Sequence, residues 1–478
     1  MSRRSLFFIF FTMLLSLGVD WSKKIKKVMT IGGQKQTIEG YSPKRVKKCD
    51  LIEMKSNQQN VMQCASEWKR MKNRRDVPYR KVYWLLDSRF DFLLPSFMRE
   101  FKVKKENIIL VNSYHSKSRE KWNKIYVPYE IKNTVVLMEP DDINRVFSEY
   151  LQLDQPGFLI AFSGAGLPIS DRLVSLTATG AVADKCNDKW WQFCCFADNR
   201  ILTPCTYQYC SLEALQAGID RLLYKYSRVV VKKPCLSGGY QMKVLSSGND
   251  LESYKERLKN REPDQIFLVS EYIPHRQSFA GMGIVRRDGS VYFINTITEQ
   301  VLYREVAYEG LIYPAFLNDN YKDEIRNMTE KIGKVLGQSG YFGFYNVDYI
   351  LGDDNRMYAI EINARLGFST ILVACLYGDN FWKLLRGDCM SGTEYQGKRL
   401  VLGKIKAKEG RSYSDLKSYS NIIHWFQAQN GFFKTYFCGT DEPEKFEYGS
   451  YIGVFGEFFD ETDKEEFILN MFWRRCIE

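Results

Sequence analysis

From residue 82 to about residue 183, short apolar runs alternate with longer polar connectors. Four of these runs are VYWLL, NIILV, TVVLM and FLIAF, at residues 82–86, 107–111, 134–138 and 158–162. Continuous apolar strands joined by longer, partly helical connectors are typical of a parallel sheet with helices on its faces. The pattern therefore predicts a small α/β domain over residues 82–183.

A second set of expected strands begins after residue 184 and precedes an amphipathic helix. The strands fall at residues 228–234, 265–273, 281–285 and 291–298, which are rich in β-branched and aromatic residues. Within residues 323–336, apolar residues recur at spacings of three and four, which places them on one face of a helix: Ile325, Met328, Ile332 and Val335. These elements indicate an α+β domain over residues 184–394.

Residues 345–362 have the pattern of a β-hairpin around a turn at residues 352–355. The simplest register, without a bulge, gives three opposed pairs: Leu351–Arg356, Asp348–Ala359 and Asn346–Glu361. Because side chains alternate between the two faces of a strand, this register puts four polar side chains on one face: Asn346, Asp348, Glu361 and Asn363.

Three of these side chains are candidate metal ligands. Asp348, Glu361 and Asn363 offer carboxylate and amide oxygens without a histidine or cysteine, and such a set suits magnesium beside a phosphate. The alternative is a solvated polar face of the hairpin. The apolar residues on the other face, Val347 and Ile362 among them, favour the ligand interpretation, because charges among core residues usually have a partner.

A second candidate site is the loop after residue 233. Lys233 ends an expected strand directly before Pro234, and Gly238 and Gly239 follow. A lysine and free backbone N–H groups in one loop suit phosphate oxygens; the alternative is an ordinary surface lysine. The motifs GxxxxGK[ST] and GxGxxG are absent, which argues against a P-loop kinase and a Rossmann dehydrogenase.

The positive charge of the chain is concentrated near its N-terminus. The 478 residues carry a formal charge of +11, and residues 20–81 alone contain 17 Lys and Arg against 6 Asp and Glu, which is also +11. The rest of the chain is nearly neutral, so the basic composition does not indicate a nucleic-acid-binding protein. Residues 1–81 are therefore interpreted as an apolar segment followed by a basic extension.

The N-terminal apolar segment, residues 6–17, is shorter than the roughly 20 residues of a spanning helix. Three interpretations of this segment stay open: a signal-peptide core, a short membrane anchor and an extension from an upstream start site. The 12 cysteines contain no CxxC pair, and free thiols in a reducing compartment are expected. We expect a cytoplasmic protein, with membrane association through residues 6–17 as the alternative.

The last part of the chain, residues 395–478, predicts a small α+β domain. A basic strand-like run covers residues 398–408, and aromatic strands follow at HWFQ and GSYIGVFGEFF. Apolar residues at helical spacing predict a closing helix over residues 463–475.

Five segments, taken in order, resemble the ATP-grasp superfamily: DKCNDKWW (184–191), VVVKKPCLSGG (229–239), SEYI (270–273), GYFGFYNVD (340–348) and EINAR (361–365). The resemblance covers roughly residues 184–370. It implies a two-lobed ATP-grasp fold, with residues 82–183 as the small α/β domain that precedes it in this superfamily.

The resemblance also implies roles for individual residues. Lys185 or Lys189 would hold phosphates together with Lys233, and Gly238 and Gly239 would belong to a lid over them. The adenine would lie at a hinge formed by Glu271, Tyr272 and Ile273. Gln277 stands where many relatives place a carboxylate that binds the ribose.

The resemblance also implies a metal site. The metal ligands for two Mg²⁺ ions, with Mn²⁺ as an alternative, would be Asp348, Glu361 and Asn363. Lys233 and Arg365 are the expected catalytic residues.

The implied activity is that of a carboxylate–amine ligase that acts on amino acids or peptides. A carboxylate attacks the γ-phosphate of ATP to give an acylphosphate and ADP, and an amine then displaces phosphate to form an amide. Cationic residues and metal ions carry such chemistry, which fits a chain with three histidines. Two alternatives are an ATP-dependent phosphotransferase and a membrane-associated nucleotide-binding or scaffold protein with a vestigial site.

Overall fold

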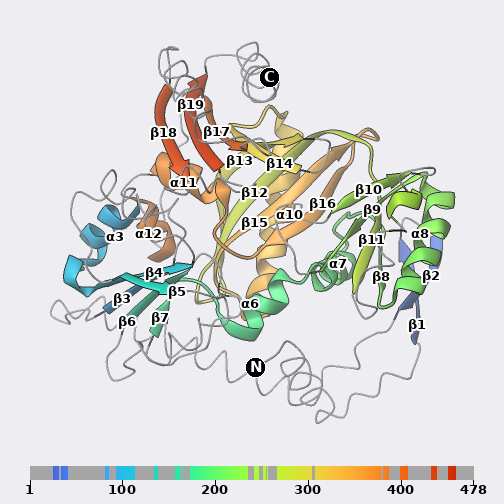
Figure 1. Cartoon of the computed structure of the whole chain (residues 1–478), viewed down its shortest axis with the longest axis horizontal. Helices are drawn as coiled ribbons and strands as arrows, with labels where there is room; N and C mark the ends of the chain where they lie inside the picture. The colour runs from blue at the N-terminus through green and yellow to red at the C-terminus, as the bar shows by residue number, and fades with distance from the viewer. Residues whose placement is uncertain are drawn as a thin grey trace, which may run out of the picture.

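The computed structural model of the chain describes residues 25–31, 34–40, 81–85, 93–113, 134–137, 157–161, 164, 173–234, 242–246, 251–254, 256, 266–303, 307–377, 380–386, 399–406, 432–438 and 451–458. These residues form a parallel sheet, a small antiparallel sheet, a large antiparallel sheet and a separate hairpin. In Figure 1 the large sheet stands between the other two, with the parallel sheet at the left and the small sheet at the right.

The parallel sheet contains the strands that the apolar runs predict. Its order is β5 (Thr134–Leu137), β4 (Ile108–Ser113), β3 (Lys81–Leu85), β6 (Gly157–Ala161) and β7 (Leu173–Ser175), and all its pairs are parallel. Helix α3 (Leu94–Phe101) packs Phe97 against Trp84 and Phe158. That this sheet corresponds to a pre-ATP-grasp domain stays a prediction.

The small sheet is antiparallel and is covered on one face by helix α8 (Leu212–Tyr226). Its order is β10 (Lys243–Ser246), β9 (Arg228–Lys232), β11 (Phe267–Glu271) and β8 (Thr206–Tyr209). Val229 and Val231 share an apolar core with Leu215 and Ile219 of the helix. Since strand side chains alternate, Lys232 lies on the face away from α8.

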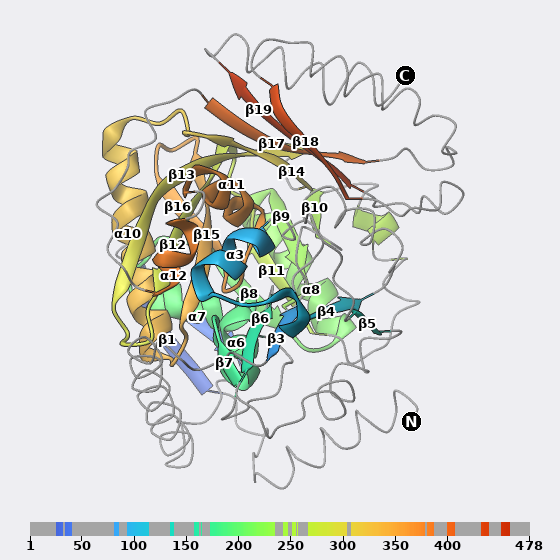
Figure 2. The ribbon, with the colours of Figure 1, turned by 90° about the vertical axis from the view of Figure 1, so that its left-hand side faces the viewer.

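The large sheet carries helices on both faces, and one of these faces lies toward the parallel sheet. Its order is β16 (Met357–Asn363), β15 (Gly343–Gly352), β12 (His275–Val285), β13 (Val291–Tyr303), β14 (Ala307–Tyr313), β17 (Arg399–Lys406), β19 (Tyr451–Phe458) and β18 (Phe432–Cys438). Helix α10 (Asp319–Gln338) runs along one face and contains the helix expected at residues 323–336. Helices α11 (Phe368–Tyr377) and α12 (Phe381–Arg386) lie on the other face, beside α3 (Figure 2).

Two helices connect the sheets near strand β16. Helix α6 (Gly180–Asn187) and helix α7 (Lys189–Asp198) both contact this strand. The Lys189 N–H donates to the carbonyl of Pro234, just after β9, at 3.2 Å. Helix α7 therefore joins the end of the small sheet to the edge of the large one.

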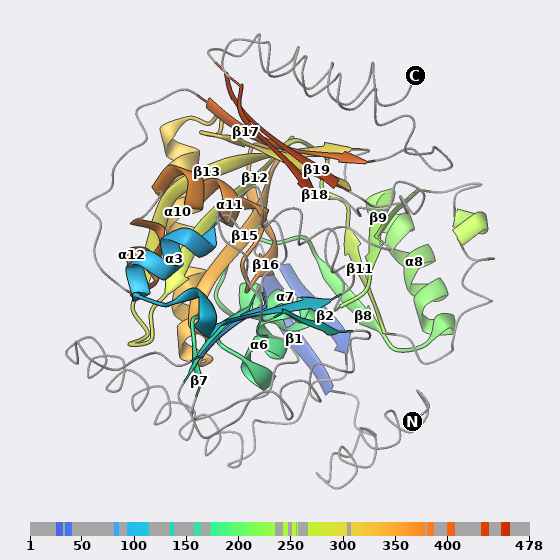
Figure 3. The ribbon, with the colours of Figure 1, turned by 60° about the vertical axis from the view of Figure 1, so that its left-hand side comes forward.

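The C-terminal strands continue the large sheet. β17 pairs with β14, and β19 and β18 follow it outward (Figure 3). Strand β17 lies in the predicted run 398–408, whereas HWFQ and the helix expected at residues 463–475 lie outside the described residues. The domain boundaries, including the one near residue 395, stay predictions.

The described part of the N-terminal extension is a hairpin of β1 (Ile25–Ile31) and β2 (Gln34–Gly40). Residues 6–17 lie outside the described residues. Of the helices that the structure does describe, none combines the length and the apolar character needed to cross a membrane.

Candidate active site

The candidate metal ligands lie on the hairpin of β15 and β16, whose register differs from the expected one. The observed pairs are Leu351–Met357, Tyr349–Ala359, Asp348–Glu361 and Asn346–Asn363. The expected pairing of Leu351 with Arg356 is wrong, because the Gly352 N–H donates to the Arg356 carbonyl at 2.9 Å. The turn thus has three residues, and Asn355 closes it with a φ of 59°, a left-handed conformation that asparagine tolerates.

A β-bulge at Ile360 determines which side chains face Asp348. Tyr349 pairs with Ala359 but Asp348 pairs with Glu361, so Ile360 is the extra residue. The shorter turn alone would move Glu361 to the opposite face, because a one-residue slip exchanges the faces of a strand. The bulge adds a second one-residue shift and restores the shared face. The four polar side chains therefore share one face, as expected. Their partners across the hairpin differ from the expected ones: Asp348 pairs with Glu361 instead of Ala359, and Asn346 with Asn363 instead of Glu361.

Asp348 is the centre of a buried polar network. Its Oδ1 accepts hydrogen bonds from Gln300 Nε2 at 2.8 Å and from Asn346 Nδ2 at 2.9 Å. Its Oδ2 accepts one from Asn363 Nδ2 at 2.9 Å. Burial and, after it, the neighbouring Glu361 carboxylate raise the pKa of Asp348 to about 7, although the hydrogen bonds from Gln300 and Asn363 oppose the rise.

Lys189 is the lysine of the DKCNDKWW segment that reaches this network. Its Nζ lies 3.1 Å from Glu361 Oε1, and only 8% of its side chain is exposed. Lys185 points elsewhere: its Nζ lies 5.6 Å from the centroid of the Trp191 ring. The structure therefore brings Lys189, and not Lys185, beside the carboxylates.

Lys232 is a residue that the sequence interpretation missed. Burial, and to a smaller extent Lys189, lower the pKa of Lys232 to about 8, while Glu361 opposes the shift. These interactions place Lys232 in the field of the carboxylate cluster. Lys233, the residue expected there, has its Nζ 6.0 Å from the ring centroid of Phe267, which belongs to the core under α8.

Arg365 is held at the other end of the cluster. Its Nη1 donates to Asn187 Oδ1 at 3.0 Å, and its Nη2 donates to Asn363 Oδ1. Asn187 in turn donates to the Ala183 carbonyl at 2.7 Å. This chain fixes the guanidinium beside the expected ligand Asn363, and Asn187 is a second residue that the sequence interpretation missed.

The expected adenine hinge follows strand β11. The Glu271 carboxylate accepts a hydrogen bond from the Cys205 N–H at 2.8 Å, and burial raises its pKa. Tyr272 is buried under the Arg228 guanidinium, which lies 3.9 Å from the ring centroid. The Ile273 carbonyl lies 2.7 Å from Nδ1 of His275.

The remaining expected nucleotide contacts are placed only in part. Gln277 is half-buried and pairs with Leu351 across β12 and β15. Gly238 and Gly239 lie outside the described residues. The roles expected for the hinge, for Gln277 and for the two glycines stay predictions.

Asp348, Glu361 and Asn363 fit the requirements of Mg²⁺. All three offer oxygen atoms, which this ion prefers. The Asp348 and Glu361 carboxylates are paired across the hairpin, and a divalent cation between them would offset the repulsion of their negative charges. The described residues contain no group of three or more His, Cys, Asp or Glu side chains suited to a metal, so the Asn363 carboxamide is needed to complete the set.

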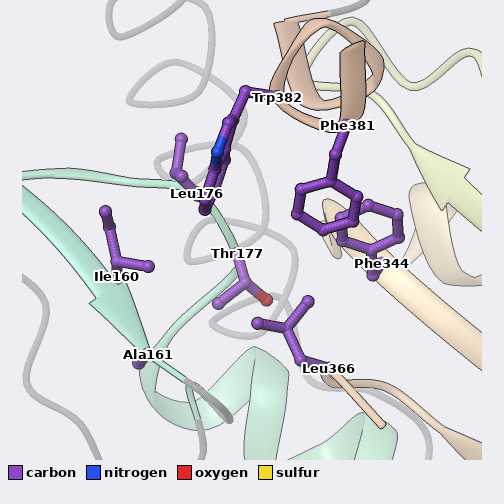
Figure 4. Close-up of a pocket in the computed structure, with 8 residues that line it drawn as sticks. All are labelled: Ile160, Ala161, Leu176, Thr177, Phe344, Leu366, Phe381 and Trp382. Atoms are coloured by element: carbon purple, nitrogen blue, oxygen red, sulfur yellow. The ribbon is translucent and has the colours of Figure 1, made fainter. Parts of the chain in front are cut away.

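A small apolar pocket lies between the parallel sheet and the large sheet (Figure 4). Its lining residues are Ile160, Ala161, Leu176, Thr177, Phe344, Leu366, Phe381 and Trp382. Phe344 precedes Asn346 by two residues, which is about 7 Å along a strand, and Leu366 follows Arg365 directly. The pocket also lies at the carboxyl end of β6, where parallel sheets commonly bind ligands.

Residues 186–369 match the family model described as an ATP-grasp domain. The chain contains an ATP-grasp domain. This span begins between Lys185 and Lys189, includes strand β9 and the hairpin, and ends just beyond Arg365. The expected resemblance to the ATP-grasp superfamily is therefore confirmed.

Two of the relatives are named as amino-acid ligases. One, from Niallia circulans, is [butirosin acyl-carrier protein]–L-glutamate ligase, which is 27% identical over 34% of this chain and 39% of its own length. The other, from Streptantibioticus cattleyicolor, is L-propargylglycine–L-glutamate ligase, which is 29% identical over 26% of this chain and 25% of its own length. The chain thus spans well under half the length of these relatives.

Solved structures share the fold over most of the chain. An ADP complex of N5-carboxyaminoimidazole ribonucleotide synthetase has a TM-score of 0.62 at 11% identity and covers 84% of this chain and 99% of that one. The biotin carboxylase domain of Hydrogenobacter thermophilus 2-oxoglutarate carboxylase, solved with MgADP, has a TM-score of 0.57 at 12% identity, covering 80% and 87%. At these identities the likeness establishes the ATP-grasp fold alone.

Proposed function

We propose that the chain is an ATP- and magnesium-dependent ligase that joins a carboxylate to an amine. The observation that carries the proposal is the meeting of opposite charges between the sheets. Asp348, Glu361 and Asn363 share one face of the hairpin, and three cations lie around them: Lys189, Lys232 and Arg365. Phosphoryl transfer needs such positioning and charge stabilisation more than it needs proton transfer.

In the first step, an oxygen of the substrate carboxylate forms a bond to the γ-phosphorus while the bond from that phosphorus to the bridging oxygen of ADP breaks. Lys189 and Lys232 would bind phosphate oxygens and stabilise the charge that shifts to ADP. Arg365 would hold the transferring phosphoryl group or the substrate carboxylate. Mg²⁺ bound by Asp348, Glu361 and Asn363 would supply electrostatic stabilisation of the phosphates.

In the second step, the amine attacks the acyl carbon of the acylphosphate, phosphate leaves with the bonding electron pair, and the nitrogen loses a proton. Both steps require exclusion of water, because water would hydrolyse the acylphosphate.

The substrates we propose are amino acids or peptides. The names of the two curated relatives both include L-glutamate as a substrate, which supports this class. We further propose a cytoplasmic location, because five cysteines between residues 186 and 210 carry free thiols.

The test is ATP turnover by the purified chain with pairs of acids and amines. We expect ADP and phosphate only when both partners of a productive pair are present, together with a new amide that mass spectrometry identifies. A stable phosphoester would instead establish a phosphotransferase. Nucleotide binding without turnover for any pair in a broad amino-acid and peptide panel would contradict the ligase proposal. Asp348→Asn serves as the inactive control for contaminating ATPases.

A further inference from the structure

Strand β16, which carries two of the candidate metal ligands, is the edge strand of the large sheet. Among the described strands it pairs only with β15. An edge strand leaves a row of backbone N–H and C=O groups without a neighbouring strand. The outer edge of β16 is contacted by helix α7, so a helix stands where a further strand would pair.

The side chain of Gln192, from α7, bonds to this edge as a strand residue would. Its Oε1 accepts a hydrogen bond from the Ile362 N–H at 2.9 Å, and its Nε2 donates to the Ile362 carbonyl at 2.7 Å. Two opposed residues of an antiparallel ladder exchange the same pair of bonds. The Gln192 carboxamide therefore replaces one missing residue of a neighbouring strand.

The Gln192 side chain is fixed in this orientation. Its Nε2 also donates to the Cys186 carbonyl at 2.9 Å, near the end of helix α6. Both amide hydrogens and the amide oxygen are thus engaged, and only 1% of the residue is exposed. A buried polar group with all its hydrogen bonds made rigidifies the segment that it contacts.

The position of this contact relates it to the metal ligands. Ile362 stands directly between Glu361 and Asn363, and the bulge at Ile360 precedes it by two residues. If the bulge moved along β16, every residue between its old and its new position would turn to the opposite face of the sheet. A bulge moved past Glu361 would therefore turn this side chain away from Asp348. A pair of hydrogen bonds at Ile362 fixes the register on the C-terminal side of the bulge.

We propose that Gln192 is a positioning residue for the metal site, and this inference rests on the proposed function. By holding the Ile362 peptide, it keeps Glu361 and Asn363 on the face of Asp348. The same helix places Lys189, three residues earlier, against Glu361. Helix α7 thus fixes both the backbone and the side chain of a candidate ligand.

The experiment compares metal-dependent and metal-free nucleotide binding in the full chain. Gln192→Met keeps the side-chain volume but removes all three hydrogen bonds. Gln192→Glu keeps an acceptor for the Ile362 N–H and, when ionised, has no donor for the Ile362 carbonyl. Gln216→Met, on the outer helix α8, is the matched control. Mn²⁺ binding is followed by electron paramagnetic resonance in the presence of ADP, and ADP binding without metal by calorimetry.

We expect both Gln192 variants to bind Mn²⁺ about 10- to 100-fold more weakly in the presence of ADP, the range for loss of a residue that supports metal ligands. Metal-free ADP binding should stay within about twofold of the wild-type value, and Gln216→Met should match the wild type throughout. If Gln192→Met does not fold, the Gln192→Glu variant alone decides the comparison.

If the wild type binds Mn²⁺ in the presence of ADP, two results would overturn the role of Gln192 and leave the proposed function intact. One is folded variants with unchanged Mn²⁺ affinity. The other is an equal loss of ADP binding with and without metal, which would mean that Gln192 only supports the fold. A wild-type protein that binds no Mn²⁺ in the presence of ADP would refute the proposed function and this inference together.

Discussion

The two sides of the candidate site are built differently. The carboxylates lie within paired strands of the large sheet, where Asp348 accepts hydrogen bonds from three neighbouring side chains. The cations come from the ends of elements: Lys232 ends β9, Lys189 begins α7 and Arg365 follows β16. The carboxylate side is fixed by a ladder of hydrogen bonds, whereas on the cation side Lys189 is held by an ion pair and Arg365 by two side-chain hydrogen bonds.

This difference indicates a division of tasks. A metal ion requires ligands at fixed distances, and the hydrogen-bonded pair of strands β15 and β16 provides them. A nucleotide must enter and leave, and lysines at the ends of elements can follow its phosphates. We therefore expect substitutions on the carboxylate side to cause the largest losses in the rate of ADP release. Substitutions on the cation side should cause losses that differ in size from one lysine to the next.

The largest effect is expected for Glu361→Gln, which removes one negative charge from the proposed metal site. ADP release should fall about 10²- to 10³-fold, the range for losing one preorganised electrostatic contact. The fold should persist, because the hydrogen bonds at Ile362 are unchanged. Steady-state ADP release by a coupled assay measures the loss. Glu213→Gln, in the first turn of α8, is the control; equal rates for the two variants would remove Glu361 from the site.

A smaller effect is expected on the cation side, where Lys232 and Lys233 form a matched pair of adjacent lysines. Lys232→Met should lower ADP release about 10²-fold, because a charge beside the phosphates is lost. Lys233→Met should change it less than about threefold, because this side chain lies over Phe267. The same assay separates them, and a larger loss for Lys233→Met would restore the role that the sequence resemblance gave to Lys233.

A smaller effect again is expected from pH. The pKa of Lys232 is lowered to about 8, so its positive charge is present below pH 8 and is lost as the pH rises through this value. ADP affinity should therefore weaken by up to about tenfold between pH 8 and pH 9. Calorimetric titrations at constant ionic strength measure it. The Lys232→Arg variant keeps its charge over this range, so its ADP affinity should stay constant between pH 8 and pH 9. If the affinity of the wild type and of this variant changed with pH in the same way, Lys232 would be excluded as the titrating group.

Much of the fold follows from the order of apolar runs and from the five segments of the ATP-grasp resemblance. The faces shared within each strand, by Asn346 with Asp348 and by Glu361 with Asn363, were also predictable, because alternation along a strand depends only on sequence. The face shared by Asp348 and Glu361 agrees with the expectation because the shift from the shorter turn and the shift from the bulge cancel. The pairs were not predictable, because Asn355 adopts a left-handed conformation and Ile360 forms a bulge. Both choices depend on the strands and helices packed around the hairpin.

The lysines show the same limit. In the run RVVVKK, three consecutive valines leave no apolar–polar alternation that assigns a face to Lys232 or Lys233. Only the packing of Val229 and Val231 against α8 decides it. For Lys185 and Lys189, a single helix would put both near one face, but the chain bends at Asp188 between α6 and α7. The bend separates the two side chains.

The smallest effect on activity is expected for Lys185→Met, which sharpens the comparison within the cation side. The Lys185 ammonium lies over the Trp191 ring at 5.6 Å, so its loss should destabilise the protein by about 0.5–1 kcal/mol and change ADP release less than about twofold. Urea unfolding and the ADP assay measure the two quantities separately. The Lys189→Met variant should differ in activity: its ADP release should fall about 10²-fold, because the Lys189 ammonium contacts Glu361. If Lys185→Met lowers ADP release as strongly as Lys189→Met, both lysines bind phosphate and helix α6 belongs to the site.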